Sequence, residues 1–516
     1  MSEAHVSFPP AGPGESRRSG EEKLAPNRLG IAGIVFFVVA AAAPLVGMTG
    51  AVPVAIVLGN GAAAPGAYLA AGLVLLVFSV GYAAMSHKVA NTGAFFAFVG
   101  RGLGIVPGVG TAFVSLLAYL AIQLAIFGFF GALAAGQVDA ELGIDLAWWA
   151  WALIAWVVVL ALSVLQVDIG AKVLGLLMAT EVVSLLIVAV VVLIQGGGPD
   201  GLAPLDTFSP DKILAGGLAG SAGIALAFAF ASYIGFEATA IYAEETKDPK
   251  RAVPVATYTA VGLITVLFAV TSWAMVSGLG TDSVVDRTVA ISSVEGVPLA
   301  DPAQVLFSVA NQYVGGWLAE LMSWLVLSSL FAGLLAFQNS AARYFFSLGR
   351  AGVLPRTFDR TNRRGAPVVG ALATSAIAAL VIVVFAATDK DPVLNLFYWF
   401  SGLAVLAIVV VEILVSVAVI VHFRAEPEGA KVWNTLVAPL LSIVGLAVAA
   451  YLIMSRFALL AGTVAEGKDP TTQAFALDST GWTLVLAPFV VLVLGMGIGA
   501  VRRRQENAEA IADLVT

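Results

Sequence analysis

Cysteine, histidine and charged side chains are scarce in this chain of 516 residues. It has no cysteine, which excludes disulfides, iron–sulfur clusters and thiol catalysis. Its three histidines, His5, His87 and His422, lie far apart in the sequence, so we expect no histidine-based catalytic site, no metal centre and no cofactor. Charged residues make up 11% of the chain, whereas a soluble domain carries about 25%. The formal net charge of −7 argues against a nucleic-acid partner.

Apolar residues take the place of the missing charges. Hydrophobic residues account for 60% of positions, and the mean hydropathy is +0.97. A helix needs about 20 apolar residues to cross a hydrocarbon core about 30 Å thick. Twelve such runs follow one another, at 30–59, 65–85, 106–135, 146–166, 173–195, 214–243, 253–279, 314–347, 367–387, 393–421, 434–456 and 481–501. We therefore predict an all-α polytopic membrane protein with twelve transmembrane helices, and a short additional helix over 303–313.

The two ends of the chain and its basic residues predict the orientation. Residues 1–28 are polar and rich in proline and glycine, which predicts a disordered cytosolic tail, and residues 504–516 predict a charged cytosolic tail. With the N-terminus inside, all but five of the 26 lysines and arginines fall in segments that face the cytosol; the five are Lys212, Arg287, Lys390, Arg456 and Lys468. The positive-inside rule then predicts a multi-pass protein of the cytoplasmic membrane with both termini in the cytosol.

The sixth apolar run contains a carboxylate, Glu237, two residues after Gly235. An ionisable group at that depth is costly unless it faces protein or water, so it typically marks a transport pathway. A neighbouring glycine predicts that the helix breaks there, as transporter helices do around their substrates. This pattern predicts a membrane transporter.

The first run also predicts a break, because Pro44, Gly47, Gly50 and Pro53 fall within ten residues of each other. Prolines remove backbone hydrogen bonds, and glycines permit non-helical angles. Amides freed after Gly47 would form the N-terminus of a second half-helix, which suits an anion such as a carboxylate, and the carbonyls before it suit an ammonium group or a cation. A simple packing kink is the alternative. A similar break at Ser232–Gly235, five helices later, favours an inverted repeat instead.

These residues resemble the amino acid–polyamine–organocation (APC) superfamily of secondary transporters, which includes the amino acid permeases. The similarity runs from about Asn27 to Arg503. Its most specific part is the sixth run and the loop after it, and two further stretches support it. The residues concerned are Gly235-Phe-Glu237, Ala243-Glu-Glu245, Lys247, Pro249, Arg251 and Pro254-Val-Ala256, then Asn91-Thr-Gly-Ala-Phe95, and Ala341 to Pro355.

The resemblance implies the LeuT-type fold, with two inverted repeats of five helices in a transporter core over 29–422 and two peripheral helices over 423–503. It places the substrate between broken helices 1 and 6. Backbone amides of Gly47, Met48, Thr49 and Gly50 would bind a carboxylate, and carbonyls and side chains of Phe230, Ala231, Ser232, Tyr233 and Ile234 would bind the α-amino group and line the site. Two departures stand out: two residues separate the glycines of the first break, and Ala231 replaces the large aromatic of arginine–agmatine antiporters.

Five polar positions are candidates for coupling transport to an ion. Glu237 matches a glutamate of many proton-dependent relatives, so we expect it to act in proton coupling or gating; a structural carboxylate is the alternative. Glu181 lies where some relatives carry a lysine in place of a sodium ion; it could titrate or bind a cation, or it could extend to the membrane surface. Ser328 and Ser329 resemble hydroxyls that complete a sodium site, although such serines often bond their own helix. Glu412, in the tenth run, is either functional or structural.

The sequence therefore predicts a secondary active transporter of amino acids that works by alternating access, with proton coupling. An exchanger, a sodium-coupled symporter or an importer of polyamines or other organic amines is the alternative. The small residues Ala231 and Ser232 favour a neutral amino acid over a polyamine. An enzyme is not expected, since the intramembrane carboxylates have no histidine partner. The expected partners are a small-molecule substrate and the lipid bilayer, with no nucleic acid, in a monomer or a homodimer.

Overall fold

The computed structural model describes residues 30–88, 95–165, 168–241, 246–427 and 429–504. Within these ranges the chain is almost entirely helical, and β-structure is limited to three isolated bridges. The predicted tail over 1–28, residues 505–516 of the C-terminal tail, and the 91–94 and 243–245 parts of the family resemblance lie outside the described residues.

The first half of the chain begins with several short helical pieces and continues with long helices. In order these are α1 (Ile31–Ala42), α2 (Pro44–Val46), η1 (Gly47–Ala51), α3 (Val52–Val54), η2 (Ala55–Asn60), η3 (Gly61–Ala63), α4 (Ala64–Ser86), α5 (Phe95–Leu103), α6 (Ile105–Leu142), α7 (Trp148–Leu165), α8 (Asp168–Ile194), α9 (Pro204–Phe208), α10 (Pro210–Ile213), η4 (Gly217–Ala219), α11 (Ala222–Ala231) and α12 (Ala238–Ile241).

The second half contains fewer interruptions. Its helices are α13 (Pro249–Leu279), α14 (Val284–Ser292), α15 (Ala303–Tyr313), α16 (Gly316–Arg350), η6 (Arg356–Asp359), α17 (Val368–Ala387), η7 (Pro392–Phe397), α18 (Tyr398–Ala425), η8 (Trp433–Val437), α19 (Ala438–Ala461) and α20 (Ser479–Arg504). The helix α15 covers 303–313, which confirms the additional short helix predicted from the sequence.

Ten helical stretches of the described residues are long and apolar enough to cross a membrane, or eleven if one bent pair counts as a span. This confirms a polytopic, helical membrane protein, while the number twelve stays a prediction. One stretch, Ile31–Ser86, has 56 residues and contains the first two predicted runs. The predicted run 214–243 is not one straight helix, because Pro210–Ala219 is bent by 114° from Ala222–Ala231.

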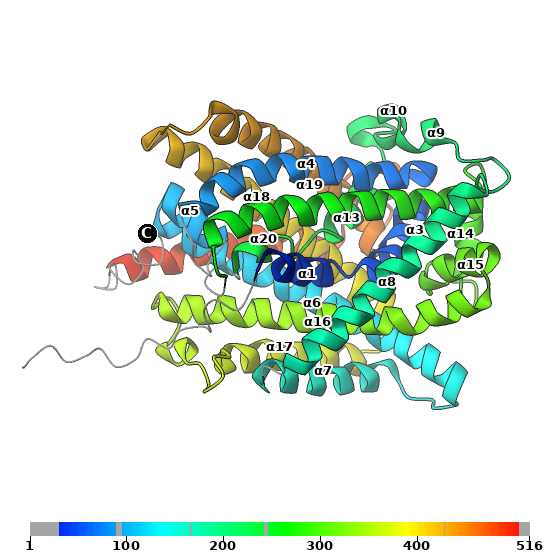
Figure 1. The fold of residues 1–516 in the computed structure, drawn as a ribbon, viewed down its shortest axis with the longest axis horizontal. Coiled ribbons are helices and arrows are strands. Elements are labelled where there is room, and N and C mark those ends of the chain that lie inside the picture. Colours follow the sequence, from blue (N-terminus) through cyan, green and yellow to red (C-terminus); the bar gives the residue numbers. More distant parts are fainter. Residues whose placement is uncertain (1–29, 89–94, 166–167, 242–245, 428, 505–516) are drawn as a thin grey trace, which may run out of the picture.

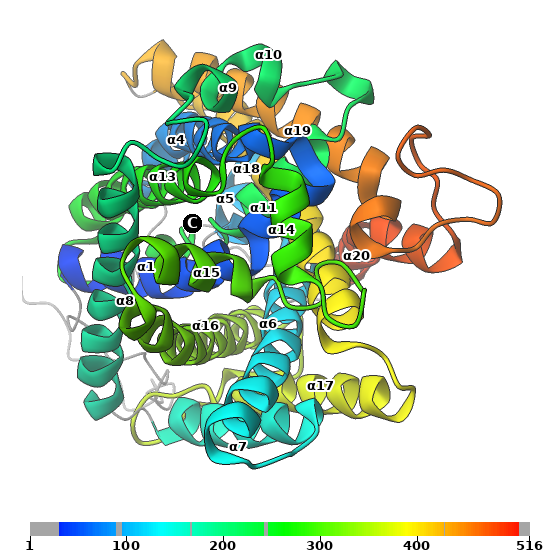
Figure 2. The ribbon, with the colours of Figure 1, turned by 90° about the vertical axis from the view of Figure 1, so that its right-hand side faces the viewer.

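Most of the long helices run along the longest axis of the molecule, and α8 crosses them obliquely (Figure 1). The short helices α9, α10, α14 and α15 gather at one end, and α5 lies at the other (Figure 1). Seen from the end that carries α14 and α15, α7, α17 and α20 lie at the edge of the bundle (Figure 2). The residues that follow α1, 44–51, are all buried. The broken first stretch is thus enclosed by helices, where an irregular backbone is tolerated.

A buried hydrogen-bonded network joins four helices beside this interior. The Gln123 amide of α6 donates to the Gln338 side-chain oxygen of α16 over 2.7 Å. Gln338 in turn donates to the Ala371 carbonyl and the Ser375 hydroxyl of α17, at 2.8 and 3.0 Å. The Trp156 indole of α7 donates to the Ser375 carbonyl at 2.7 Å. Because buried polar groups need partners, these bonds hold α6, α7, α16 and α17 together in one orientation.

Candidate functional site

The first stretch breaks at Ala43, which has a left-handed conformation with φ of 42°. Pro44 has no N–H, and the Leu45 amide donates to Glu181 Oε1 over 2.5 Å instead of continuing the helix. The Gly47 amide already donates to the Ala43 carbonyl at 3.1 Å. The break therefore lies four residues before Gly47, and the expectation that the second half-helix begins after Gly47 is wrong.

Glu181 is the acceptor that this break requires. The side chain comes from α8 and is 2% exposed, so the alternative in which it extends to the membrane surface is wrong. Its Oε1 also accepts a hydrogen bond from the Ser329 hydroxyl of α16 over 2.8 Å. Ser328 instead donates to the Leu325 carbonyl of its own helix at 2.8 Å. A carboxylate at the N-terminal end of a half-helix is favoured by the helix dipole, and here the protein supplies that carboxylate itself.

The residues predicted to bind a carboxylate form one π-helical turn, Gly47–Ala51. Single π-turns inside α-helices often occur at functional sites. Met48 and Thr49 are fully buried, and the Thr49 hydroxyl donates to the Leu45 carbonyl of its own helix at 2.8 Å. These two side chains are therefore directed into protein and not toward a free space.

Gly50 lies directly beneath two stacked aromatic rings. Phe129 of α6 and Phe397 of η7 stack with ring centroids 4.6 Å apart. A Cβ placed on Gly50 would come within 2.9 Å of both rings. The π-turn is thus covered on this side by an aromatic pair, and a side chain at position 50 would require the rings to shift.

The second break separates α11 from α12. Residues 232–237 form turns, and Gly235 has φ of 113°, a conformation that other residues rarely adopt. This confirms the break predicted at Ser232–Gly235. Among the described residues, the carbonyl oxygens of Ser232 and Ile234 accept no hydrogen bond, whereas those of Phe230 and Ala231 accept from the turn. The break therefore presents two free backbone acceptors.

The two breaks lie against each other. A Cβ on Gly235 would come within 2.6 Å of the Ala41 side chain at the end of α1. A Cβ on Gly47 would come within 3.2 Å of the Ser232 hydroxyl and 3.1 Å of the Phe268 ring of α13. Residues 194 and 185 positions apart in sequence are thus in contact, and glycine is what lets their backbones approach.

Glu237 stabilises the second break. Its side chain is fully buried, Oε1 accepts the Tyr119 hydroxyl of α6 at 2.7 Å, and Oε2 accepts the Gly235 amide at 2.9 Å. Its backbone carbonyl accepts the Tyr82 hydroxyl of α4 at 2.8 Å. Two donors on one buried carboxyl group stabilise its ionised form. The side chain therefore holds the second break in this conformation.

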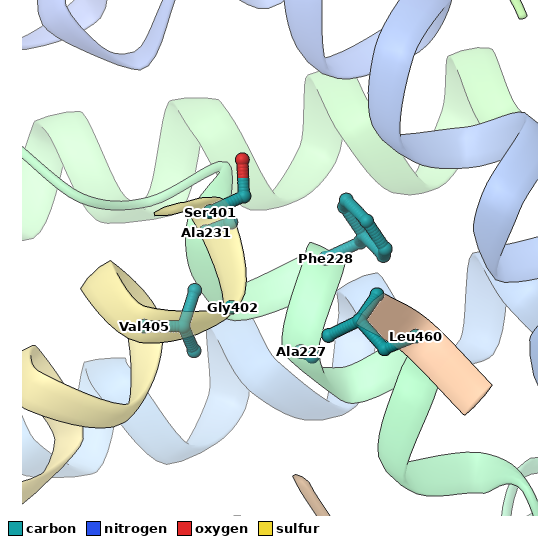
Figure 3. Close-up of a pocket in the computed structure, with 7 residues that line it drawn as sticks. All are labelled: Ala227, Phe228, Ala231, Ser401, Gly402, Val405 and Leu460. Carbon is teal, nitrogen blue, oxygen red and sulfur yellow. The ribbon is translucent and has the colours of Figure 1, made fainter. Parts of the chain in front are cut away.

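The other predicted site residues differ in where they point. The Ser232 hydroxyl donates to the Phe228 carbonyl at 2.9 Å. The Tyr233 hydroxyl donates to the Tyr68 carbonyl, also at 2.9 Å. Phe230 and Ile234 are buried. Ala231 is half-buried and lines a different space. It lies at a narrow crevice between α11, α18 and α19 that Phe228 and Ser401 also line (Figure 3).

Sequence reasoning missed the aromatic residues of the site. Tyr82, Tyr119, Phe129 and Phe397 lie in apolar runs where such residues usually serve as core or face lipid. The hydroxyls of Tyr82 and Tyr119, each within a hydrophobic run, were the available signal, because a buried hydroxyl needs a partner.

Comparison with known proteins adds the family. A family model described as amino acid permease matches residues 33–505. An uncharacterized transporter of Legionella pneumophila is 27% identical over 250 residues, 48% of this chain and 49% of that protein. A proline-specific permease of Emericella nidulans is 26% identical, over 56% of this chain and 54% of its own. The lysine-specific permease LysP of Lactococcus lactis is 26% identical, over 46% of each chain. The chain thus spans about half the length of these curated relatives.

Proposed function

Because the chain belongs to the amino acid permease family, we propose that it is a secondary active transporter that carries amino acids across the cytoplasmic membrane by alternating access. Membership of this family indicates a multi-pass membrane transporter and not an enzyme. The observation that carries the proposal is the contact between the two helix breaks, at Gly235 with Ala41 and at Gly47 with Ser232, deep inside the helical bundle.

The substrate lies between these breaks. The backbone of Gly47, Met48, Thr49 and Gly50 faces its carboxylate, because this turn directly follows the N-terminal end of the half-helix that begins at Pro44. The free carbonyls of Ser232 and Ile234 accept hydrogen bonds from its α-amino group, and Phe230 and Tyr233 form the wall. The stack of Phe129 on Phe397 must separate from Gly50 before a substrate can enter from that side.

The coupling ion of this cycle is a proton, and its carrier is Glu237. The Gly235 amide that bonds this carboxylate belongs to the break itself, so opening of the break removes a donor from Glu237 and favours its protonation. Glu181 is the second carboxyl group in contact with a break, through the Leu45 amide. Sodium is the second candidate, because the Glu181 carboxylate and the Ser329 hydroxyl meet at the first break.

The substrate class is a neutral amino acid, with a cationic one as the alternative. The described break segments 41–50 and 230–236 contain no acidic side chain that could pair with a second positive charge. A proline-specific and a lysine-specific permease are both similar to this chain. L-proline and L-lysine are therefore the informative probes, because they differ in side-chain charge.

The chain crosses the membrane twelve times, with both termini in the cytosol. The stretch Ile31–Ser86 is long enough for two crossings of about 20 residues each. Gly59, with φ of −98° and ψ of −120°, interrupts the helix between them. Residues 29–422 then form the ten-helix core of two inverted repeats, and 423–503 the peripheral pair. The protein acts as a monomer or a homodimer.

Uptake by purified full-length protein in liposomes tests the proposal. We expect L-proline to accumulate when the outside is made acidic, and a sodium gradient at equal pH to have no effect. Glu237→Gln should bind substrate but fail to concentrate it, because glutamine keeps hydrogen bonds and cannot titrate. Accumulation driven by sodium alone would favour the second coupling ion. Transport of putrescine with both amino acids inert would overturn the amino acid assignment.

A further inference from the structure

Arg456 is a buried arginine on α19 that the cycle above does not use. Its side chain is 3% exposed, and among the described residues no carboxylate forms an ion pair with it. The guanidinium donates instead to four backbone carbonyls. These are Gly220 at 3.2 Å, Pro470 at 3.0 Å, Thr471 at 3.1 Å, and Ala219. A buried charge is costly unless it is hydrogen-bonded, so these bonds hold the four carbonyls around the side chain.

Two of the carbonyls, those of Ala219 and Gly220, lie just before α11, and this helix has a joint at each end. Before it, the chain turns at Gly216 and Gly217, with φ of 77° and 57°, and the segments on the two sides of Gly220 are bent by 114° from each other. After it comes the second break, at Gly235. Glycine adopts such left-handed backbone without strain. The helix α11 can therefore change direction as a short rod, unless its first turn is held.

The other two carbonyls, those of Pro470 and Thr471, lie in the loop between α19 and α20. Asp469 shapes this loop, because its side chain accepts the Thr471 amide at 2.9 Å and the hydroxyls of Thr471 and Thr472 at 2.6 and 2.9 Å. The turn built in this way presents its carbonyls to the guanidinium. Arg456 thus fastens the start of α11 to α19 and to an ordered loop.

The start of α11 also meets the first broken stretch. The Ser221 hydroxyl donates to the Gly59 carbonyl at 2.5 Å. A Cβ on Gly59 would come within 2.9 Å of the Ala225 side chain of α11. The two broken stretches are therefore joined where Arg456 bonds, at an end of the bundle that the positive-inside rule assigns to the outside.

Ring contacts connect α11 with the aromatic cover of Gly50. Phe228 of α11 packs edge-on against Tyr398, with ring centroids 5.9 Å apart. The Tyr398 ring lies 5.4 Å from the Phe397 ring, which stacks on Phe129 beside Gly50. A change in the direction of α11 therefore reaches the rings that cover the π-turn.

We propose that Arg456 is a positioning residue of the transport cycle, which holds α11 against α19 while the outer side is closed. When that side opens, the guanidinium releases the carbonyls of Ala219 and Gly220. The bonds to Pro470 and Thr471 persist, so the charge stays hydrogen-bonded in both states. Bonds that exist in one state alone shift the equilibrium toward that state. The assignment of this side to the outside rests on the proposed function, whereas the hold of Arg456 on α11 does not.

Labelling of a cysteine at the second break tests this contact, because the chain has no cysteine of its own. An impermeant thiol reagent is applied to full-length Ser232→Cys without substrate, on intact cells for the outer side and on inside-out vesicles for the cytosolic side. Adding Arg456→Gln should raise the outer rate about tenfold or more, because two bonds from a charged donor are lost in the closed state alone. The cytosolic rate should fall. General loosening of the protein would raise both rates, so opposite changes are specific to a shift between two states.

Three further variants complete the test. Lys468→Gln removes a charge from the same loop without removing a bond to α11, and as the matched control it should leave both rates unchanged. Arg456→Lys should lie between the wild type and Arg456→Gln, because a single ammonium group cannot reach four carbonyls. Asp469→Ala loosens the turn that supports the guanidinium, so it should change both rates in the direction of Arg456→Gln but less. It also serves if Arg456→Gln does not reach the membrane.

Unchanged rates in the Arg456 and Asp469 variants, or a rise on both sides, would overturn the proposal. A thiol that reacts from neither side in every variant would overturn it as well. Opposite changes with the two sides exchanged would keep the contact and contradict the proposed topology. If the wild type transports neither L-proline nor L-lysine, the proposed function fails, and the labelling, which needs no substrate, still decides whether Arg456 holds α11.

Discussion

Substitution of Glu181 should show how much its carboxylate stabilises the broken first stretch. The side chain accepts hydrogen bonds from the Leu45 amide of one helix and the Ser329 hydroxyl of another. Glu181→Gln keeps an oxygen that can accept both bonds but removes the charge. Glu181→Leu has a similar size and removes every acceptor. Comparison of the two variants separates the charge from the hydrogen bonds.

The expected magnitudes follow from these contacts. In Glu181→Leu the buried Leu45 amide is left without a partner, which costs about 1–3 kcal/mol, and loss of the Ser329 bond adds about 1 kcal/mol. In Glu181→Gln the bonds become neutral and about half as strong, so we expect a loss of about 1–2 kcal/mol. Ser329→Ala should cost about 1 kcal/mol. Ser328→Ala is the matched control, because its hydroxyl bonds only its own helix, and it should change stability by less than about 0.5 kcal/mol.

Thermal unfolding of the purified variants in one detergent measures this order. Glu181→Leu should unfold at the lowest temperature, Ser329→Ala below Ser328→Ala, and Ser328→Ala close to the wild type. Equal midpoints for the Leu and Gln variants would refute the reasoning, since the hydrogen bonds would then contribute nothing. Equal midpoints for the two serine variants would show that Ser329 does not bond Glu181.

Three further results are expected. Gly235→Ala should destabilise the protein by about 2–4 kcal/mol in the same unfolding assay, because the residue has positive φ and its Cβ would meet Ala41 at 2.6 Å. Gly262→Ala is the control, since a Cβ at this position would have nothing within 4 Å. Equal effects of the two substitutions would contradict the contact between Gly235 and Ala41. Gly50→Val should abolish amino acid binding while the protein still reaches the membrane, because its side chain would collide with Phe129 and Phe397; normal binding of labelled L-proline would exclude this turn from the site. Tags at residues 1 and 516 should both be protected from protease in intact cells, and an accessible C-terminal tag would contradict the topology.

The sequence located the second break better than the first. Gly235 stands beside a carboxylate in an apolar run, so both the break and its position followed from two residues. In the first stretch the glycines suggested a break after Gly47, but the chain breaks at Ala43. The physical reason lies in Pro44, which has no N–H and disfavours the helical conformation of the residue before it. Greater weight on the proline than on the glycines would have placed the break correctly.

The partners of the site residues could not be predicted from one sequence. Glu181 and Leu45 are 136 residues apart, and Glu237 and Tyr119 are 118 apart. Hydropathy places each of them in a membrane run but does not give the rotation of one helix against another. The sequence therefore identified Glu181, Glu237 and Ser329 as candidates without showing that Glu181 contacts both the first break and Ser329. The contact of Phe129 and Phe397 with Gly50 depends on the same packing of helices, which hydropathy does not give.

The central claim is that the substrate lies between the two breaks, and the absence of cysteine permits a direct test. In Ser232→Cys the introduced thiol is the one thiol of the protein, beside Gly47. Its rate of reaction with a water-soluble thiol reagent should fall when L-proline is added. The matched control Ser323→Cys, on α16, should react at the same rate with and without L-proline. The account predicts that L-proline slows the labelling of Ser232→Cys and not that of Ser323→Cys. Equal labelling of Ser232→Cys with and without a substrate that the same vesicles transport would contradict the account.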